Sequence, residues 1–160
     1  MLYKNTDAMK KLILTFLFVP ALTIAFAQKI KEGTVPDAVK QALTQMYPNA
    51  KDVDWEMEDG NYEGEFDNNK VETSVVFTPA GAHVMTEIEI STTELPAGVH
   101  TYVKNTLGGK KITEAAKMTT AAGVVSYEAE VGGKDYIFDA NGNYLSTEIE
   151  KDGEDDDDKK

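Results

Sequence analysis

Carboxylates are the most abundant chemically capable side chains of this chain, and many of them alternate with apolar residues. The 160 residues include 28 acidic and 16 basic ones, which gives a formal net charge of −12. A surface of that charge repels nucleic acid and anionic lipid and attracts cationic partners. We therefore expect a basic partner, no nucleic acid, and no membrane contact once an N-terminal leader is removed.

The residue types of common catalytic and metal centres are scarce. The sequence has no cysteine and no arginine, and its two histidines, His83 and His100, stand in no metal-ligand spacing. Neither a serine-hydrolase motif nor a phosphate-binding Gly-rich loop occurs. The sequence therefore predicts that the protein is not an enzyme and binds no cofactor.

One short segment resembles the start of a calcium loop. Asp139, Asn141 and Asn143 alternate as oxygen ligands would, and Glu150 stands at the twelfth position. The sharp turn of such a loop needs glycine at position six, where Tyr144 stands instead. Asn-Gly between two strands is also typical of a hairpin turn. We therefore expect a turn here, and no metal ligands.

A set of glutamates forms the candidate partner-binding surface. If Trp55 and the other apolar strand residues face the helices, strand parity sends the intervening carboxylates to the opposite face. The candidate residues are Glu56, Glu58, Glu63, Glu65, Glu87, Glu89, Glu128, Glu130, Glu148 and Glu150. Opposite charge on a partner would then steer its approach.

Other interpretations of the same residues stay open. The carboxylates also fit an ordinary solvated sheet face. Like charges directly across strands destabilise a sheet, so some acids would instead pair with Lys51, Lys70 or Lys134. Trp55 fits a core position, or a partner-binding hot spot if the parity is reversed.

The elements that position these carboxylates come from a sequence repeat. The stretch from Phe77 to Glu89 recurs 61 residues later, from Phe138 to Glu150. Each copy predicts a strand end, a turn at Gly81 or Gly142 with a positive φ angle, and a strand of alternating polarity. In these last strands Ile88 and Ile149 should point inward and the glutamates outward.

Each repeat begins with a helix and continues with strands. Val35-Pro36 and Leu95-Pro96 are typical helix starts, and apolar residues follow them at helical spacing. Four runs with period-2 alternation, separated by turn residues, follow each helix. The predicted fold is α+β: two tandem units, each one helix followed by a four-stranded antiparallel meander, with the helices on one face of the sheet or sheets.

The two ends of the chain differ from the repeats in composition. Lys10-Lys11, an apolar run and Ala25-Phe-Ala27 predict a signal peptide over residues 1–27. Unit 1 then covers 28–91, with a flexible lead-in over 28–34, and unit 2 covers 92–150. Residues 151–160 carry five consecutive acids and predict a disordered acidic tail.

The order of these motifs resembles the PepSY-like family, which is also described as β-lactamase-inhibitor-like. The resemblance is carried by Val35-Pro36-Val39, Tyr62, Phe77 and Gly81, and again by Leu95-Pro96-Val99, Tyr127, Phe138 and Gly142. It implies a non-catalytic periplasmic or secreted protein. The disulfides and the inhibitory loop of the β-lactamase inhibitor proper are not matched, so that activity is not carried over.

Two functions therefore follow as expectations. The first is a non-catalytic binding or inhibitory module that docks a basic envelope protein or peptide through its acidic sheet face. The second is a calcium-binding or buffering envelope protein that uses the acidic face and the tail. An enzyme is the most remote alternative, because no nucleophile and base can be paired from the motifs.

Overall fold

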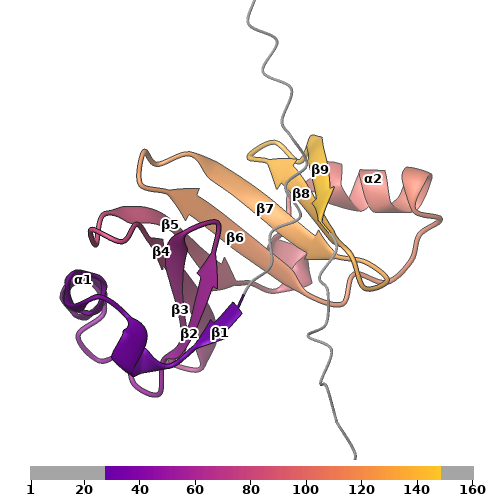
Figure 1. Cartoon of the computed structure of the whole chain (residues 1–160). Coiled ribbons are helices and arrows are strands. Elements are labelled where there is room, and N and C mark those ends of the chain that lie inside the picture. Colours follow the sequence, from indigo (N-terminus) through magenta and orange to yellow (C-terminus); the bar gives the residue numbers. More distant parts are fainter. Residues whose placement is uncertain (1–27, 149–160) are drawn as a thin grey trace, which may run out of the picture.

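A computed structural model describes residues 28–148 of the protein, and its main element is one antiparallel sheet. Nine strands lie in this sheet in the order in which they occur in the chain, and two α-helices pack against it (Figure 1). The predicted signal peptide and acidic tail lie outside the described residues. Within residues 28–148, neither helix is long and apolar enough to cross a membrane.

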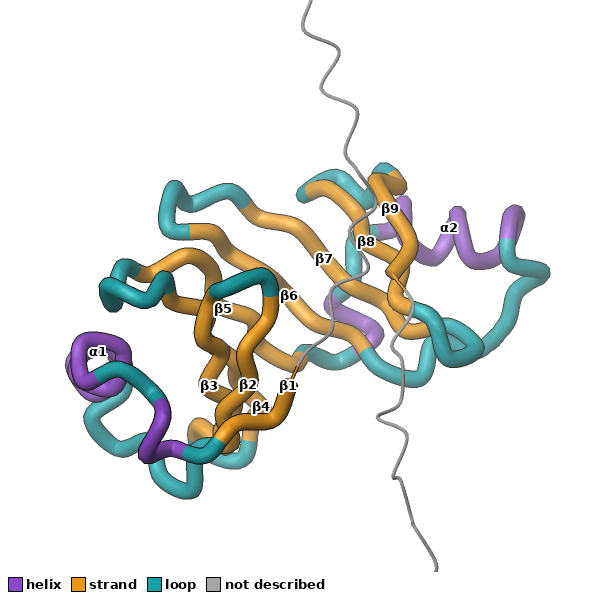
Figure 2. Tube along the Cα trace, viewed as in Figure 1, coloured by secondary structure: helices purple, strands orange, loops and turns teal. Residues whose placement is uncertain are grey.

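The elements follow one another with short connections (Figure 2). The helices are α1 (Asp37–Met46) and α2 (Ala97–Thr106), preceded by the 3-10 turns η1 (Glu32–Thr34) and η2 (Thr92–Glu94). The strands are β1 (Gln28–Ile30), β2 (Asp54–Glu58), β3 (Asn61–Asn68), β4 (Val71–Phe77), β5 (His83–Glu89), β6 (Ala115–Thr120), β7 (Val125–Glu130), β8 (Asp135–Asp139) and β9 (Tyr144–Glu148).

The predicted fold of two tandem α+β units is wrong, because the strands form one continuous, mostly β structure. Strands β5 and β6 pair from Met85↔Thr120 to Glu89↔Ala116, so the hydrogen-bond ladder runs through the expected boundary between the units. The backbone bond from Ile90 N–H to the Ala115 carbonyl (2.9 Å) extends this seam. A strand at the edge of a separate meander would carry unpaired backbone N–H and C=O groups. Pairing of β5 with β6 provides hydrogen-bond partners for these groups in both meanders.

The prediction of a flexible lead-in over residues 28–34 is also wrong. Residues 28–30 form strand β1, which pairs with β2 from Gln28↔Met57 to Ile30↔Trp55. Lys29 stands opposite Glu56 across these strands, although their side chains form no ion pair. A run of three residues shows no period from which a strand could be predicted.

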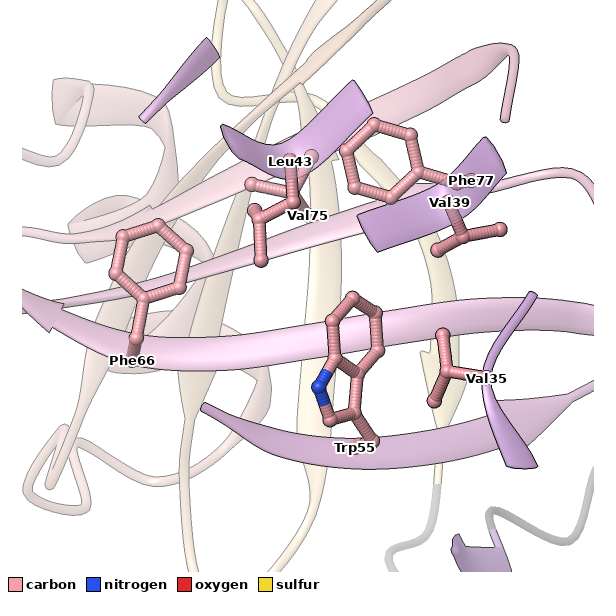
Figure 3. Close-up of a cluster of buried hydrophobic side chains, with 7 residues drawn as sticks. All are labelled: Val35, Val39, Leu43, Trp55, Phe66, Val75 and Phe77. Carbon is pink, nitrogen blue, oxygen red and sulfur yellow. The ribbon is translucent and has the colours of Figure 1, made fainter. Parts of the chain in front are cut away.

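Helix α1 covers the first part of the sheet. Pro36 stands at its N-cap, where the missing N–H costs no hydrogen bond, and Tyr47 ends it before Pro48. Val39 and Leu43, one turn apart, point from the helix into the core between helix and strands (Figure 3). That core also contains Val35, Trp55, Phe66, Val75 and Phe77. The core position predicted for Trp55 is confirmed, since its side chain is 4% exposed.

Helix α2 covers the last part of the same sheet face. Val99 and Val103 pack on Ala115, Ala129 and Phe138 in a second core. Between the two cores Ile88 pairs with Lys117 across the seam, and neither helix covers this row. Ile88 is therefore 38% exposed, and the prediction that it points into a core is wrong. Ile149 lies outside the described residues.

The two repeated hairpin turns press against the first turns of the two helices. Gly81 (φ 78°) and Gly142 (φ 82°) both have the predicted positive φ. A Cβ atom on Gly81 would lie 2.5 Å from the Ala38 carbonyl oxygen, and one on Gly142 would lie 2.9 Å from the Gly98 Cα atom. Only glycine allows this approach, so each turn fixes the position of its helix on the sheet.

Candidate functional site

Strand register places most of the predicted glutamates on the sheet face opposite the helices. Glu56 pairs with Glu63, Ser74 with Glu87, and Ala116 with Glu128. None of these residues shares the parity of Trp55, Val75 or Phe138, which face the helices. We call this surface the acidic face. Its predicted members are Glu56, Glu58, Glu63, Glu65, Glu87, Glu89, Glu128, Glu130 and Glu148, while Glu150 lies outside the described residues.

The glutamates of the acidic face differ in burial. Glu58, Glu65, Glu89 and Glu148 are exposed, whereas Glu56, Glu63, Glu87, Glu128 and Glu130 are half-buried. The half-buried positions lie on both sides of the β5–β6 seam. The structure therefore brings glutamates of both repeats onto one surface, whose role in binding stays a prediction.

Apolar residues of the acidic face are buried although no helix covers them. Ala116, Met118 and Ile137 are each at most 9% exposed, and Asp135 beside them is 6% exposed. Glu87 pairs with Met118, and Ile137 pairs with Glu128, so these apolar side chains lie among the carboxylates. Within residues 28–148 neither helix lies on this face, and the sheet is strongly twisted along its strand order (Figure 1).

The charges that act on Glu58 come from both ends of the sheet. Burial raises the pKa of Glu58, and so do the charges of Glu63, Asp59 and Glu148. Glu58 belongs to β2 and Glu148 to β9, at opposite ends of the sheet order. Charges act on each other strongly only over short distances in salt solution, so the two ends of the sheet approach each other over the acidic face.

Glu87, near the middle of the sheet on β5, is the most strongly perturbed of these acids. Burial raises the pKa of Glu87 to about 7, and the charges of Glu63, Asp135, Glu148 and Glu72 add to the shift. Burial is also the largest cause of the raised pKa of Glu65 and of Glu72, and the charges of neighbouring carboxylates raise both values further. In each case the ionised form is disfavoured by lost hydration and by like charge.

Few opposite charges balance these acids. Among residues 28–148 the one side-chain ion pair joins Lys40 to Asp37 (3.1 Å) on the surface of α1. Lys51, Lys70 and Lys134 therefore form no ion pair with carboxylates of the described residues, contrary to the alternative considered above. Glu63 instead accepts a hydrogen bond from the hydroxyl of Ser74 across the β3–β4 ladder.

The segment that resembles a calcium loop is a turn. The Oδ1 atom of Asp139 accepts hydrogen bonds from the N–H groups of Asn141 (2.8 Å) and Asn143 (2.9 Å), and Oδ2 accepts one from the Asn143 side chain. These bonds lower the pKa of Asp139, and the bond from the Asn143 side chain has the largest effect. Within the described part of the chain no three His, Asp or Glu side chains are grouped to hold a metal ion.

Several residues of the acidic face were not predicted from the sequence. Asp135 pairs with Glu130 on one side and with Glu148 on the other, and Ser74 and Met118 flank Glu87. The alternation of β7 through the Gly132-Gly133 hairpin into β8 would have placed Asp135 on the face of Glu130. The position of Met118 depends on the β5–β6 seam, for which the sequence holds no local signal.

The protein thus combines one antiparallel sheet, two helices on one of its faces, and an acidic, partly apolar opposite face. The family model described as "Putative beta-lactamase-inhibitor-like, PepSY-like" matches residues 24–81 and 60–146. The chain belongs to this PepSY-like family, and the two overlapping matches confirm the predicted family and agree with a tandem repeat.

Solved structures from Bacteroides share this fold. One is described as a putative periplasmic protein of Bacteroides eggerthii; it is 24% identical, with 71% of this chain and 88% of that chain covered and a TM-score of 0.63. Another is a BLIP-like protein of Bacteroides fragilis; it is 23% identical, with 75% and 90% covered and a TM-score of 0.56. At these identities the similarity establishes the fold. No curated protein matches the chain.

Proposed function

We propose that the protein is a non-catalytic binding module of the periplasm or of the extracellular space, which docks a basic partner protein or peptide on its acidic face. The location is supported by the predicted signal peptide and by the relative described as periplasmic. The binding role is supported by the inhibitor-like description of the family and by the BLIP-like relative.

The observation that carries this proposal is the state of Glu87. Its side chain is half-buried among other acids, and none of the lysines of residues 28–148 pairs with it. A buried carboxylate without a counter-charge disfavours the free protein. A cationic side chain of a partner would supply that charge and relieve the repulsion from Glu63 and Asp135.

The apolar residues of the acidic face define the partner further. Met118, Ala116 and Ile137 lie between carboxylates on a surface without a covering helix. Apolar contact at the centre with charges around it is the usual composition of a specific interface. We expect a partner segment that presents apolar side chains flanked by lysine or arginine. The surrounding acids would speed its approach at low ionic strength.

The test compares two triple variants of the chain that begins at Gln28. Glu63, Glu87 and Glu148 are changed to Gln in the first, which removes three charges from the acidic face. The control carries Glu32→Gln, Asp37→Asn and Glu94→Gln, which remove three charges near η1, α1 and η2. Glutamine keeps the capping box that Glu94 forms with Ser91.

Each chain is immobilised, proteins are captured from an envelope extract, and binding kinetics are measured at low and high salt. The proposal predicts that one captured protein associates more slowly with the acidic-face variant and normally with the control, and that salt reduces the difference. Equal association rates for both variants at low salt would refute docking on this face. Stabilisation of the free chain by millimolar Ca²⁺ would favour the calcium-buffer alternative instead.

A further inference from the structure

A second candidate site lies at the end of α2, and its charge is opposite to that of the protein. A pocket of about 450 Å³ is lined by Thr92 of η2, by His100 and Lys104 of α2, and by Lys110, Lys111 and Ile112 of the following loop. Its lining contains no acidic residue. In a chain with a net charge of −12, three lysines in one pocket are a local reversal of charge.

The lysines of this pocket have no counter-ion in the described part of the protein. The ion pair between Lys40 and Asp37 lies on α1, so Lys104, Lys110 and Lys111 form no ion pair with a carboxylate of residues 28–148. The like charges of these three lysines repel each other across the pocket, weakly because all three side chains are exposed to solvent. An anion that binds between them would remove this repulsion.

The loop that carries two of these lysines is anchored at both ends. At its start Gly108 (φ 69°) and Gly109 (φ 68°) end α2, and the N–H of Gly109 donates to the Val103 carbonyl (3.0 Å). At its other end Thr113 donates through N–H (3.0 Å) and through its hydroxyl (3.2 Å) to the Glu130 carbonyl of β7. The lysine backbone is thus held in place before a ligand arrives, which lowers the entropy cost of binding.

The corresponding part of the first repeat lacks this composition. With the offset of 60 residues that relates Pro36 to Pro96, Thr92 corresponds to Glu32, Lys104 to Thr44 and Lys110 to Ala50, while His100 and Lys111 correspond to Lys40 and Lys51. The repeated fold therefore does not require Lys104 or Lys110. Three lysines and a histidine occur together at these positions in the second repeat, whereas the first repeat has Lys40, Lys51 and the acidic Glu32 there.

We propose that this pocket binds a small polyanion of the phosphate type. The polar side chains of its lining can donate hydrogen bonds: three ammonium groups, the imidazole of His100 and the hydroxyl of Thr92. Lysine binds phosphate oxygens as a point charge, without the planar geometry that arginine requires. The net negative charge of the chain repels a long polyanion such as nucleic acid, so the ligand is a small molecule. This site is independent of the acidic face.

The experiment titrates inorganic pyrophosphate into the chain that begins at Gln28, at low salt, and follows heat and backbone amide shifts. We expect one bound pyrophosphate per chain, with shifts concentrated at Thr92, His100 and Gly109–Ile112. The variant with Lys104, Lys110 and Lys111 changed to Gln should bind about tenfold more weakly or worse. The control variant, with Lys40, Lys51 and Lys70 changed to Gln, should bind as the unchanged chain does.

All six lysines are exposed or half-buried on the surface, so both variants should fold, and equal melting temperatures check this. Citrate, which carries a similar charge on carboxylates, distinguishes the class of anion. Tighter binding of pyrophosphate supports a phosphate site, whereas tighter binding of citrate overturns that assignment. No pyrophosphate binding at millimolar concentration, or equal weakening in the two lysine variants, would overturn the proposal as a whole.

Discussion

The hydroxyl oxygen of Tyr144 lies 2.9 Å from the hydroxyl oxygen of Thr147. In the first repeat, 61 residues earlier, the Nε2 atom of His83 lies 2.9 Å from the hydroxyl oxygen of Thr86. The rings of both residues also pack at 6.2 Å from a buried phenylalanine, Phe138 or Phe77. Both copies of the repeat thus have this contact with a threonine hydroxyl, although a histidine makes it in the first copy and a tyrosine in the second. The second copy adds a partner, because Tyr102 of α2 stacks on Tyr144 at 4.8 Å.

The first prediction concerns this stack. Tyr144→Ala removes the contacts with Tyr102 and Phe138 and should lower the free energy of unfolding by about 1–2 kcal/mol. Tyr144→Phe keeps the rings and loses only an exposed hydrogen bond, so it should cost less than about 1 kcal/mol. Urea unfolding of both variants measures the difference. Equal losses would show that the hydrogen bond, and not the stacking, carries the stabilisation.

The second prediction concerns Gly142, whose Cβ would meet the backbone of Gly98 and Val99 at 2.9 Å. Gly142→Ala should lower the free energy of unfolding by about 2–4 kcal/mol, because it adds a backbone clash to the cost of a left-handed residue. Thermal and urea unfolding measure the change. Gly142→Val should cost at least as much.

Gly123 provides the matched control for this prediction. It sits in a hairpin turn with φ 78°, and nothing lies within 4 Å of its added Cβ. Gly123→Ala should therefore cost only the left-handed strain, about 1–2 kcal/mol. If the two alanine variants lose the same stability, the close approach of the turn to α2 contributes nothing.

Local patterns in the sequence were sufficient to predict the turns and the helix starts. Gly81 and Gly142 were found from the repeat alone, and Pro36 and Pro96 stand at the N-caps of the two helices. These features depend on a few neighbouring residues whose backbone preferences are strong. The pairing of β5 with β6 depends on two strands that are far apart in the sequence, and strand β1 forms only by pairing with the edge strand β2. Neither feature therefore has a local signal in the sequence.

The sequence was sufficient to predict which glutamates share the acidic face, but not the shape of that face. Alternation along each strand placed Glu63 and Glu87 on the face opposite Trp55, as the register confirms. The burial of Glu87 and Asp135 depends on how nine strands twist together, which is a property of the whole sheet. A sequence pattern therefore indicates which acids share a surface and not which of them lose water.

The third prediction concerns the seam between the repeats. Because β5 and β6 pair over five residue pairs, the amides that bond across the seam within residues 85–89 and 116–120 should exchange with solvent as slowly as those that bond between β3 and β4. Native-state hydrogen exchange followed by NMR measures both sets. Fast exchange confined to the seam would show that the repeats open as separate units.

The pH dependence of stability follows from the raised pKa of Glu87, about 7 against an ordinary 4.5. Between these values the folded protein holds a proton that the unfolded chain has released. The stabilisation from this group is therefore fully present below about pH 4.5 and is lost as the pH rises through 7. The raised pKa values of Glu58, Glu65 and Glu72 act in the same direction.

The last prediction follows from this loss of stability with rising pH. Glu87→Gln replaces the carboxyl group by a neutral amide of the same shape, so the variant should match the original protein near pH 4 and be more stable at pH 8, by up to about 3 kcal/mol. Urea unfolding between pH 4 and 8 measures this. Glu89→Gln, two residues along the same face and exposed, is the control and should change the pH profile little. If both variants keep the original pH dependence, Glu87 is solvated, and the acidic face does not hold the buried, unbalanced charge on which the proposed docking of a basic partner rests.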